Sequence, residues 1–218
     1  DEAVRLTGLF IKQGPVVQIR APNGKVQVNE DDDPSVLYDG PLMVLTSRFS
    51  ASASEIVAAA LQDYGRAIIV GDSTTHGKGT VQTLVELDPF MRQFGASVPQ
   101  DGAGAIKLTV QKFYRANGGS TQLKGVTPDL SIPSPADEAE VGEKALDNPM
   151  PWDEVPQADY DPLNRVSPLL TELKRRSDER LQNDHDFKYL QQDIEETRKA
   201  VQTKSVSLNE AVREAERD

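Results

Sequence analysis

The 218-residue sequence contains no cysteine and only one tryptophan. Disulfides are therefore excluded, a composition that permits an oxidising compartment without proving one. No apolar run is long enough to cross a bilayer as a helix. The net charge of −11 argues against nucleic acid as a partner, because phosphate contacts require a basic surface. Apolar residues make up 37%, below the average of globular domains, so part of the chain is not expected to be core.

The most informative stretch runs from Arg48 to Gln82 and has the pattern of a strand end, a helix, a strand and a turn. Residues 41–47 and 66–71 are apolar runs typical of strands covered on both faces. Helix formers fill residues 54–61 between them. This pattern predicts a right-handed crossover in a parallel sheet, with the chemistry at the carboxyl ends of the strands.

Three serines alternate with alanines after the first strand end, at positions 50, 52 and 54. Ser52 to Glu55 fits a capping box, in which the serine hydroxyl accepts from first-turn amides and the glutamate reaches back. The alanines also leave the amides at the helix end uncovered, so an anion could approach them. The residues alone leave both interpretations open, a structural cap and an oxyanion site.

Lys78 follows the second strand end and lies between two glycines, so no adjacent side chain crowds its stem. One interpretation is a surface lysine in a turn. The other is a general base, which requires a neutral amine. A lysine amine is neutral near pH 7 only when burial lowers its pKa from about 10.4 by roughly 3 units. The apolar strand at 68–70 could supply such an environment.

Four separated blocks of sequence carry a family resemblance. They are SASASEI at 50–56, QDYGRA at 62–67, GKGTVQ at 77–82 and KFYRANGGSTQLKGVTPD at 112–129. Together they resemble the tail-specific, or C-terminal processing, proteases of bacteria, which use a serine–lysine dyad. The resemblance implies an α/β fold, a crotonase/Clp-protease-like mixed sheet with crossover helices followed by a small helical C-terminal region.

Position by position, the resemblance assigns Ser52 as the nucleophile and Lys78 as the general base. Gln82, four residues further on, would orient the lysine amine. The backbone amides of Gly14 and Ala53 would form the oxyanion hole. Acyl transfer by such a dyad requires no metal and no cofactor.

Two acidic residues near this stretch have other expected roles. Asp63 matches a family position, and we expect a structural carboxylate that pairs with Arg66 or caps the turn. The turn before Lys78 is one residue longer than in the family and carries His76 in place of an aromatic residue. Asp72 and His76 therefore offer a conventional triad as an alternative, although a neighbouring pair in a turn lacks a fixed orienter.

The remaining patterns divide the chain into three parts. Residues 1–132 are expected to be part of a protease core, 133–163 an acidic proline-bearing linker, and 164–218 a helical region. In the linker, Trp152 is expected to anchor the chain to the core. Residues 80–87 and 105–114 predict strands, with a loop at 89–104. Helices are expected to begin at caps formed by Ser167 and by Ser207.

The resemblance implies a serine endopeptidase that degrades or processes periplasmic proteins recognised by apolar, unstructured C-terminal tails. It also implies a location in the periplasm or peripheral to the inner membrane, and an adaptor protein as a further partner. The chain would be a fragment that lacks the amino-terminal and PDZ regions. Two alternatives stay open, a non-catalytic scaffold in which the longer turn misplaces Lys78, and a hydrolase of small-molecule acyl groups.

Overall fold

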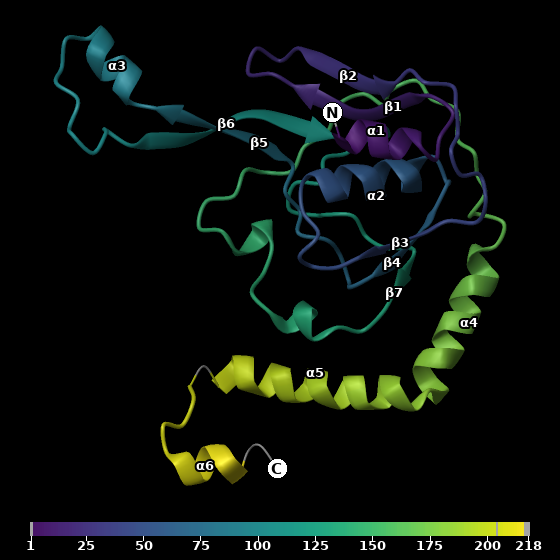
Figure 1. Ribbon diagram of the computed structural model, residues 1–218. Helices are drawn as coiled ribbons and strands as arrows, with labels where there is room; N and C mark the ends of the chain where they lie inside the picture. Colours follow the sequence, from purple (N-terminus) through teal and green to yellow (C-terminus); the bar gives the residue numbers. More distant parts are fainter. Residues whose placement is uncertain (1, 204, 216–218) are drawn as a thin grey trace.

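The computed structural model describes residues 2–203 and 205–215, which form an α/β body with two appendages (Figure 1). Its strands are β1 (Gly14–Arg20), β2 (Val26–Asp31), β3 (Met43–Thr46), β4 (Ile68–Gly71), β5 (Thr80–Glu86), β6 (Ala105–Tyr114) and β7 (Leu130–Ser131). The first helices along the chain are α1 (Glu2–Gly8), α2 (Ala53–Asp63) and α3 (Asp88–Gln93). α1 packs against β1 and β2, α2 packs against β1 and β4, and the outer parts of β5 and β6 extend away from both helices.

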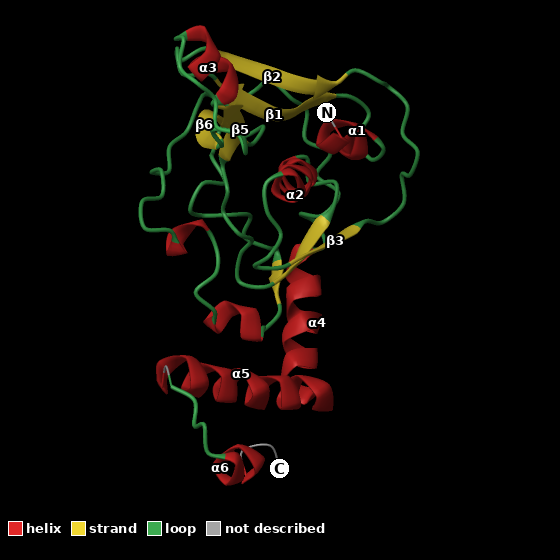
Figure 2. Cartoon of the chain, turned by 60° about the vertical axis from the view of Figure 1, so that its left-hand side comes forward, coloured by secondary structure: helices red, strands yellow, loops and turns green. Residues whose placement is uncertain are grey.

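The strands form two sheets, an antiparallel one in the order β2-β1-β6-β5 and a parallel one in the order β3-β4-β7. β3 and β4 pair in parallel from Met43 opposite Ile68 to Thr46 opposite Gly71, and α2 connects them. The predicted crossover and the α/β class are therefore confirmed. The parallel and antiparallel pairings, expected in one mixed sheet, lie in two sheets on either side of α2 (Figure 2).

The hydrophobic core lies around the inner face of α2. Its buried side chains are Ile11, Val16, Ala58, Ala59, Ala60, Leu61, Tyr64, Ala67, Ile69 and Val126. Because an alanine side chain is a single methyl group, the run of three alanines lets the backbone of α2 approach the strands closely. This packing fixes the axis of α2 and therefore the position of its amino end, where Ser52 lies.

The close approach of β3 and β4 depends on Gly71. A Cβ atom added at this glycine would lie 1.9 Å from the carbonyl oxygen of Thr46, a backbone atom that cannot move without disturbing the ladder. We expect Gly71→Ala to lower the free energy of unfolding by about 3 kcal/mol, equivalent to a fall in Tm of roughly 6–12 °C. Thermal denaturation of both proteins measures this difference.

Gly119→Ala is the matched control for this substitution. The nearest atom to its added Cβ is 3.4 Å away and belongs to the Asn117 side chain. We expect its stability to change by less than about 1 kcal/mol. Equal Tm values for the two variants would contradict the importance of the close approach at Gly71.

β5 and β6 continue beyond the body as a two-stranded arm that leads to α3 (Figure 1). Both strands agree with their predicted ranges, but the expectation of a loop over 89–104 was wrong at its start. Pro89 occupies the first turn of α3, where its missing amide costs nothing, and Asp88 places a carboxylate at the positive helix end. Asp88 also accepts a hydrogen bond from the Ala103 amide at 2.7 Å, which closes the tip of the arm.

Residues 133–163 follow the surface of the body and contain two short 3₁₀ turns, η1 (Pro135–Glu138) and η2 (Glu143–Ala145). The expected anchor at Trp152 is confirmed, because its indole Nε1 donates to the Ser120 carbonyl at 2.8 Å. The Lys124 ammonium lies 3.3 Å from the centre of the Trp152 ring, a cation–π contact. These contacts hold the acidic segment against the body.

Asp153 binds the segment 133–163 to the antiparallel sheet. Its carboxylate accepts from Lys112 Nζ at 2.5 Å and from the Arg20 guanidinium. Burial raises the pKa of the Asp153 carboxyl, but the hydrogen bonds and charges of Lys112 and Arg20 outweigh burial and leave the pKa below its ordinary value. A carboxyl with a depressed folded-state pKa contributes stability above its unfolded pKa, and this contribution is lost as the pH falls.

We therefore expect Asp153→Asn to lower the free energy of unfolding at pH 7 by about 1–2 kcal/mol, since the partly exposed pair is screened by solvent. The difference between the variant and the wild type should shrink as the pH falls below about 4, where the wild-type carboxyl also becomes protonated. Thermal denaturation at pH 7 and pH 3 measures both effects. Asp159→Asn, an exposed position in the same segment, serves as the control and should change neither value. A difference that stays constant between the two pH values would contradict this linkage.

The C-terminal part consists of α4 (Leu170–Asn183), α5 (His185–Thr203) and α6 (Glu210–Ala215). Both predicted caps were wrong by two residues. Leu169 is the cap residue of α4 and makes no side-chain cap hydrogen bond. At α6, the Asn209 Oδ1 atom accepts from the amides of Ala211 and Val212, because asparagine stands next to the first helical turn and Ser207 does not.

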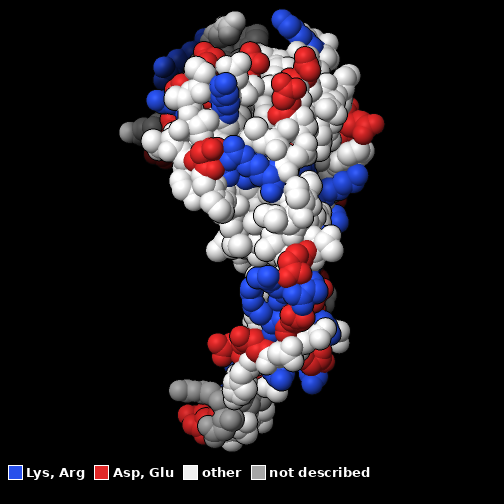
Figure 3. All heavy atoms as spheres, turned by 90° about the vertical axis from the view of Figure 1, so that its right-hand side faces the viewer, with Lys and Arg blue, Asp and Glu red and all other residues white. Residues whose placement is uncertain are grey.

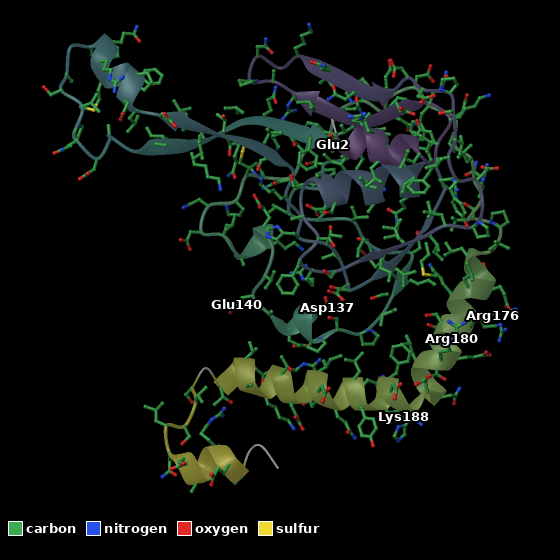
Figure 4. The ribbon with its side chains drawn as sticks, in the orientation of Figure 1. Glu2, Asp137, Glu140, Arg176, Arg180 and Lys188 are labelled. Atoms are coloured by element: carbon green, nitrogen blue, oxygen red, sulfur yellow. The ribbon has the colours of Figure 1, made fainter. Side chains whose placement is uncertain are left out.

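α5 lies across η1, and an ion pair joins the two elements. Arg198 pairs with Glu138 at 2.8 Å, and η1 is in turn tied to the body, since Asp137 accepts from the Ser73 hydroxyl at 2.5 Å. Figure 4 shows Asp137 on the turn between the body and α5. η1 therefore connects α5 to the body at Ser73.

Charged side chains concentrate on the outer helices, as the dense basic and acidic groups below the body show (Figure 3). Arg176 and Arg180 lie along α4, and Lys188 lies near the start of α5 (Figure 4). Arg175 and Arg176 both pair with Glu172. Among the described residues, no helix has the combined length and apolarity needed to cross a membrane.

Candidate active site

Ser52 occupies the position immediately before the first residue of α2, and its backbone is strained. Its φ is +56° with ψ −110°, in a region that residues with a side chain rarely adopt. Such a conformation costs about 1–3 kcal/mol and persists only where the surroundings impose it. In the described part of the chain, only Leu123 and Asn164 are further non-glycine residues with positive φ. The strain presents the half-buried Ser52 at the mouth of the helix.

Glu55 is the residue that imposes this geometry. Its side chain is fully buried, and its Oε2 atom accepts from the Ser52 amide at 2.8 Å and from the Lys78 amide at 3.0 Å. Its Oε1 atom accepts from the Gly77 amide at 2.7 Å and from the Thr75 hydroxyl at 2.5 Å. One carboxylate therefore joins the backbone of the candidate nucleophile to the backbone of the candidate base.

These contacts fit the ionised form of Glu55, because three of its four partners are backbone amides that can only donate. Burial raises the pKa of the Glu55 carboxyl above its ordinary value, and the four hydrogen bonds act against that rise. Sequence reasoning identified Glu55 only as half of a capping box. Its three other contacts, with Thr75, Gly77 and Lys78, join residues twenty or more positions apart, and no local pattern indicates them.

The turn that carries Lys78 is held by close backbone contacts on both sides. A Cβ added at Gly79 would lie 2.7 Å from the Gln122 amide nitrogen, and the Gly79 amide donates to Gln122 Oε1 at 2.8 Å. Gly77 has φ +87°, and its added Cβ would meet the Leu123 backbone at 3.1 Å. Both glycines beside the lysine are therefore required by the turn, and they leave the lysine stem free of neighbouring side chains.

The side chain of Lys78 does not complete the expected dyad contact. Lys78 is half-buried, and in residues 2–203 and 205–215 its Nζ atom makes no hydrogen bond or ion pair, either with Ser52 or with Gln82. Gln82 lies exposed on β5. The structure thus brings the Ser52 and Lys78 backbones to one carboxylate but leaves the hydroxyl and the amine unjoined.

The two expected oxyanion donors lie in different places. Ala53 is the first residue of α2 and is exposed, so its amide is one of the helix-end donors that have no intrahelical acceptor. Gly14 lies against Tyr64, whose hydroxyl would be 2.5 Å from an added Cβ. Tyr64 caps the opposite end of the 11-residue helix, about 16 Å from its start.

The assignment of Gly14 to the oxyanion hole is therefore not supported by this geometry. The motif around Gly14 folds as the beginning of β1, where Gly14 lies against Tyr64, the residue that caps the carboxyl end of α2. The Ala53 amide is the one donor of the pair that the structure places beside Ser52.

The alternative triad of Asp72 and His76 is contradicted. The Asp72 Oδ2 atom accepts from the Arg48 amide at 2.7 Å, and the buried Nδ1 atom of His76 has no hydrogen-bond partner. The His76 amide donates to the Ser50 carbonyl at 2.9 Å, which ties the longer turn to the serine segment. His76 therefore holds the turn through its backbone.

Asp63 is structural, as expected, but its expected partner was wrong. Its carboxylate pairs with the Arg115 guanidinium at 2.5 Å and accepts from the Asn117 side-chain amide at 2.9 Å. Arg66 instead donates to the carbonyls of Phe10 and Tyr38 at 2.9 and 2.8 Å. The pair links the end of α2 to the segment after β6, at the end of α2 opposite Ser52.

A cavity of about 330 Å³ opens beside the serine segment. Its lining comes from α1, β3 and the start of α2 and consists of Glu2, Ala3, Leu6, Val44, Leu45, Thr46, Ser50, Ala53, Ser54 and Val57. Its walls are mainly aliphatic, and Glu2 is its one ionisable group. A cavity of this lining can accept an apolar side chain next to Ser52.

Comparisons with known proteins identify the family of the chain. The family model for peptidase family S41 matches residues 1–132, and the model for the C-terminal domain of tail specific protease matches residues 136–218. The tail-specific protease of Haemophilus influenzae is 43% identical over 220 residues, covering 100% of this chain and 31% of that protein. The carboxy-terminal-processing protease of Bartonella bacilliformis is 37% identical over 139 residues, covering 63% of this chain and 29% of that protein.

Among solved structures, a photosystem II D1 C-terminal processing protease is 30% identical, with a TM-score of 0.49 over 60% of this chain and 30% of that one. The chain spans about a third of the length of the curated relatives that it matches.

Proposed function

Because the chain belongs to peptidase family S41, we propose that it carries the serine–lysine dyad of a C-terminal processing endopeptidase. The observation that carries this proposal is the Glu55 carboxylate, which holds the Ser52 and Lys78 amides on one oxygen atom. The strained serine at a helix amino end and the glycine-flanked lysine are the two groups that acyl transfer needs. Rotation of the flexible lysine stem would bring its amine to the hydroxyl.

The proposed reaction is acyl transfer in two steps. The neutral Lys78 amine takes the proton of the Ser52 hydroxyl while Oγ attacks the peptide carbonyl carbon, and the carbonyl oxygen becomes an anion that the Ala53 amide holds. The Lys78 ammonium then gives its proton to the leaving nitrogen, the C–N bond breaks, and an ester remains on Ser52. In the second step Lys78 takes a proton from water while the water oxygen attacks the ester carbon. The bond from this carbon to Ser52 Oγ then breaks, the Lys78 ammonium returns its proton to Oγ, and the acid is released.

We propose that the substrates are proteins with apolar, unstructured C-terminal tails. The relative in Haemophilus influenzae is named a tail-specific protease, and the aliphatic cavity beside Ser52 suits an apolar side chain. We place the reaction in the periplasm, and cell fractionation tests this location. An adaptor protein is a further proposed partner, supported by the exposed Val206 and Leu208 on the C-terminal region, and copurification tests it.

The assay uses a protein of the relatives' full length that carries this chain, together with an unfolded substrate ending in an apolar tail. We expect cleavage of this substrate, and a rate at least about 10-fold lower for the same substrate with a charged tail. Equal rates for the two tails would contradict tail selection. If neither substrate is cleaved, the result would contradict the proposed activity.

One observation favours a second candidate, a non-catalytic scaffold of the protease fold. The amine of Lys78 makes no hydrogen bond with Ser52 in the described residues. The same assay separates the two candidates, because a scaffold would bind the tailed substrate without cleaving it.

A further inference from the structure

β5 is an edge strand that begins beside the candidate base. The order β2-β1-β6-β5 leaves one side of β5 without a partner among the described residues. The strand starts at Thr80, two residues after Lys78, and runs for seven residues. Gln82, Thr83 and Leu84 in its middle are exposed, Leu84 by 69%. The outer side of β5 therefore has no strand partner among the described residues, and it lies next to the turn that carries Lys78.

Proteins usually protect such edges with lysine, proline, shortness or an inserted residue. The strand TVQTLVE has no lysine and no proline, and its one charge, Glu86, stands at the end remote from Lys78. Its register with β6 shifts between Val81 and Gln82, but the residue skipped by the pairing is Val110 in β6. The outer side of β5 is therefore continuous.

Other edges of the two sheets differ from β5. β3 has four residues and β7 has two, which is too short for extended pairing. β2, on the far side of the antiparallel sheet, ends in Glu30 and Asp31. β5 is the long edge without protective residues in the described part of the chain, and it is the edge that adjoins Lys78.

We propose that the extended backbone of the substrate adds to the free edge of β5 as a further strand and thereby places its scissile bond at Ser52. This inference rests on the proposed function and names how that site recognises its substrate. Strand addition takes its affinity from main-chain hydrogen bonds, which every residue except proline can make. An unfolded tail can supply such a strand at any register, whereas a folded segment cannot.

The first test changes the substrate alone. A peptide that the full-length protein cleaves is prepared as a series with one backbone nitrogen methylated at each position on both sides of the scissile bond. Because alternate amides of a strand point toward the same neighbour, we expect kcat/KM to fall about 10-fold at every second position on one side of the bond. The positions between should change kcat/KM less than about 3-fold.

The outcomes separate this inference from the proposed function. A uniform loss along the peptide, or no loss, would overturn strand addition while leaving the protease intact. Failure to cleave the unmethylated parent would overturn the proposed function and this inference together.

The second test locates the strand on the protein. Residues 1–218 contain no cysteine, so Thr83→Cys on β5 introduces a single thiol at an exposed position. Gln27→Cys on β2 is the matched control, an exposed polar position on the opposite edge of the same sheet. Each is combined with Ser52→Ala to keep the substrate uncut, and a tailed peptide with one cysteine is added under oxidising conditions.

We expect the Thr83→Cys protein to form the mixed disulfide with the peptide at least about 10-fold more than the Gln27→Cys protein. Equal yields would overturn the placement on β5. A disulfide-linked dimer of the Thr83→Cys protein that the peptide does not displace would also overturn it, because β5 would then pair with a second copy of the chain.

Discussion

Peptide cleavage is expected to fall by at least about 10⁴-fold when Ser52 is replaced by alanine, and by a similar factor when Lys78 is replaced by alanine. Without the hydroxyl no ester can form, and without the amine nothing removes the hydroxyl proton near pH 7. The two groups act in one step, so the double variant should be no slower than either single variant. Initial rates on the apolar-tailed substrate, with folding checked by circular dichroism, give these values.

Two matched controls accompany these variants. Ser54→Ala removes an exposed hydroxyl two residues from the nucleophile, and His76→Ala removes the imidazole of the rejected triad. Both should keep activity within about 10-fold of the wild type, since neither side chain takes part in the proposed proton transfer. Cleavage that survives Lys78→Ala and disappears with His76→Ala would contradict the dyad.

The second large effect is expected at Glu55. Glu55→Ala removes the acceptor of four hydrogen bonds and leaves three backbone amides without a partner in a buried place. Hydrogen bonds to a charged group contribute about 1.5–3 kcal/mol each, but they are not additive, so we expect a loss of about 3–5 kcal/mol in the free energy of unfolding. Urea denaturation of the wild type and the variant measures this loss.

Glu55→Gln gives a finer test of the same residue. The amide oxygen can still accept on one side, but the amide nitrogen on the other side cannot accept. In either orientation it faces at least one backbone N–H group, that of Gly77 at the Oε1 position or those of Ser52 and Lys78 at the Oε2 position. Because Glu55 positions the nucleophile and the base without touching the substrate, we expect kcat to fall more than about 10-fold with KM nearly unchanged, under conditions where the variant is folded. Ser54→Ala in the same helical turn should change neither stability nor kcat. A variant that loses stability but keeps full kcat would show that the carboxylate is structural only.

The elements around the site could be predicted because their signals are local. Apolar runs at 41–47 and 66–71 are long enough to identify two strands, and the helix formers between them require a crossover. β4 is buried as expected, but the expectation that the first strand is covered on both faces was wrong, because Met43 and Leu45 on β3 are exposed. The alternation over 105–114 likewise identifies β6. The caps of α4 and α6 were misjudged because several residues near each start could serve as the cap, and tertiary contacts decide among them.

The parts of the site that escaped prediction depend on distant contacts. Glu55 was recognised as a cap for Ser52, but its contact with the turn at 75–78 requires the folded crossover. Asp63 was paired with the nearby Arg66, whereas the folded chain brings Arg115 to it. Gly14 was assigned by resemblance alone, and only the path of β1 shows that it lies at the wrong end of α2.

The measurement that tests the central claim most directly is the site of acylation. The full-length protein is mixed with an apolar-tailed peptide ester, quenched in acid within seconds, digested, and analysed by mass spectrometry of the peptide that contains the three serines at 50, 52 and 54. The account predicts an acyl group on Ser52 alone, absent from the Lys78→Ala protein and present in the His76→Ala protein. An acyl group on Ser50 or Ser54, or one that forms equally without the Lys78 amine, would contradict it.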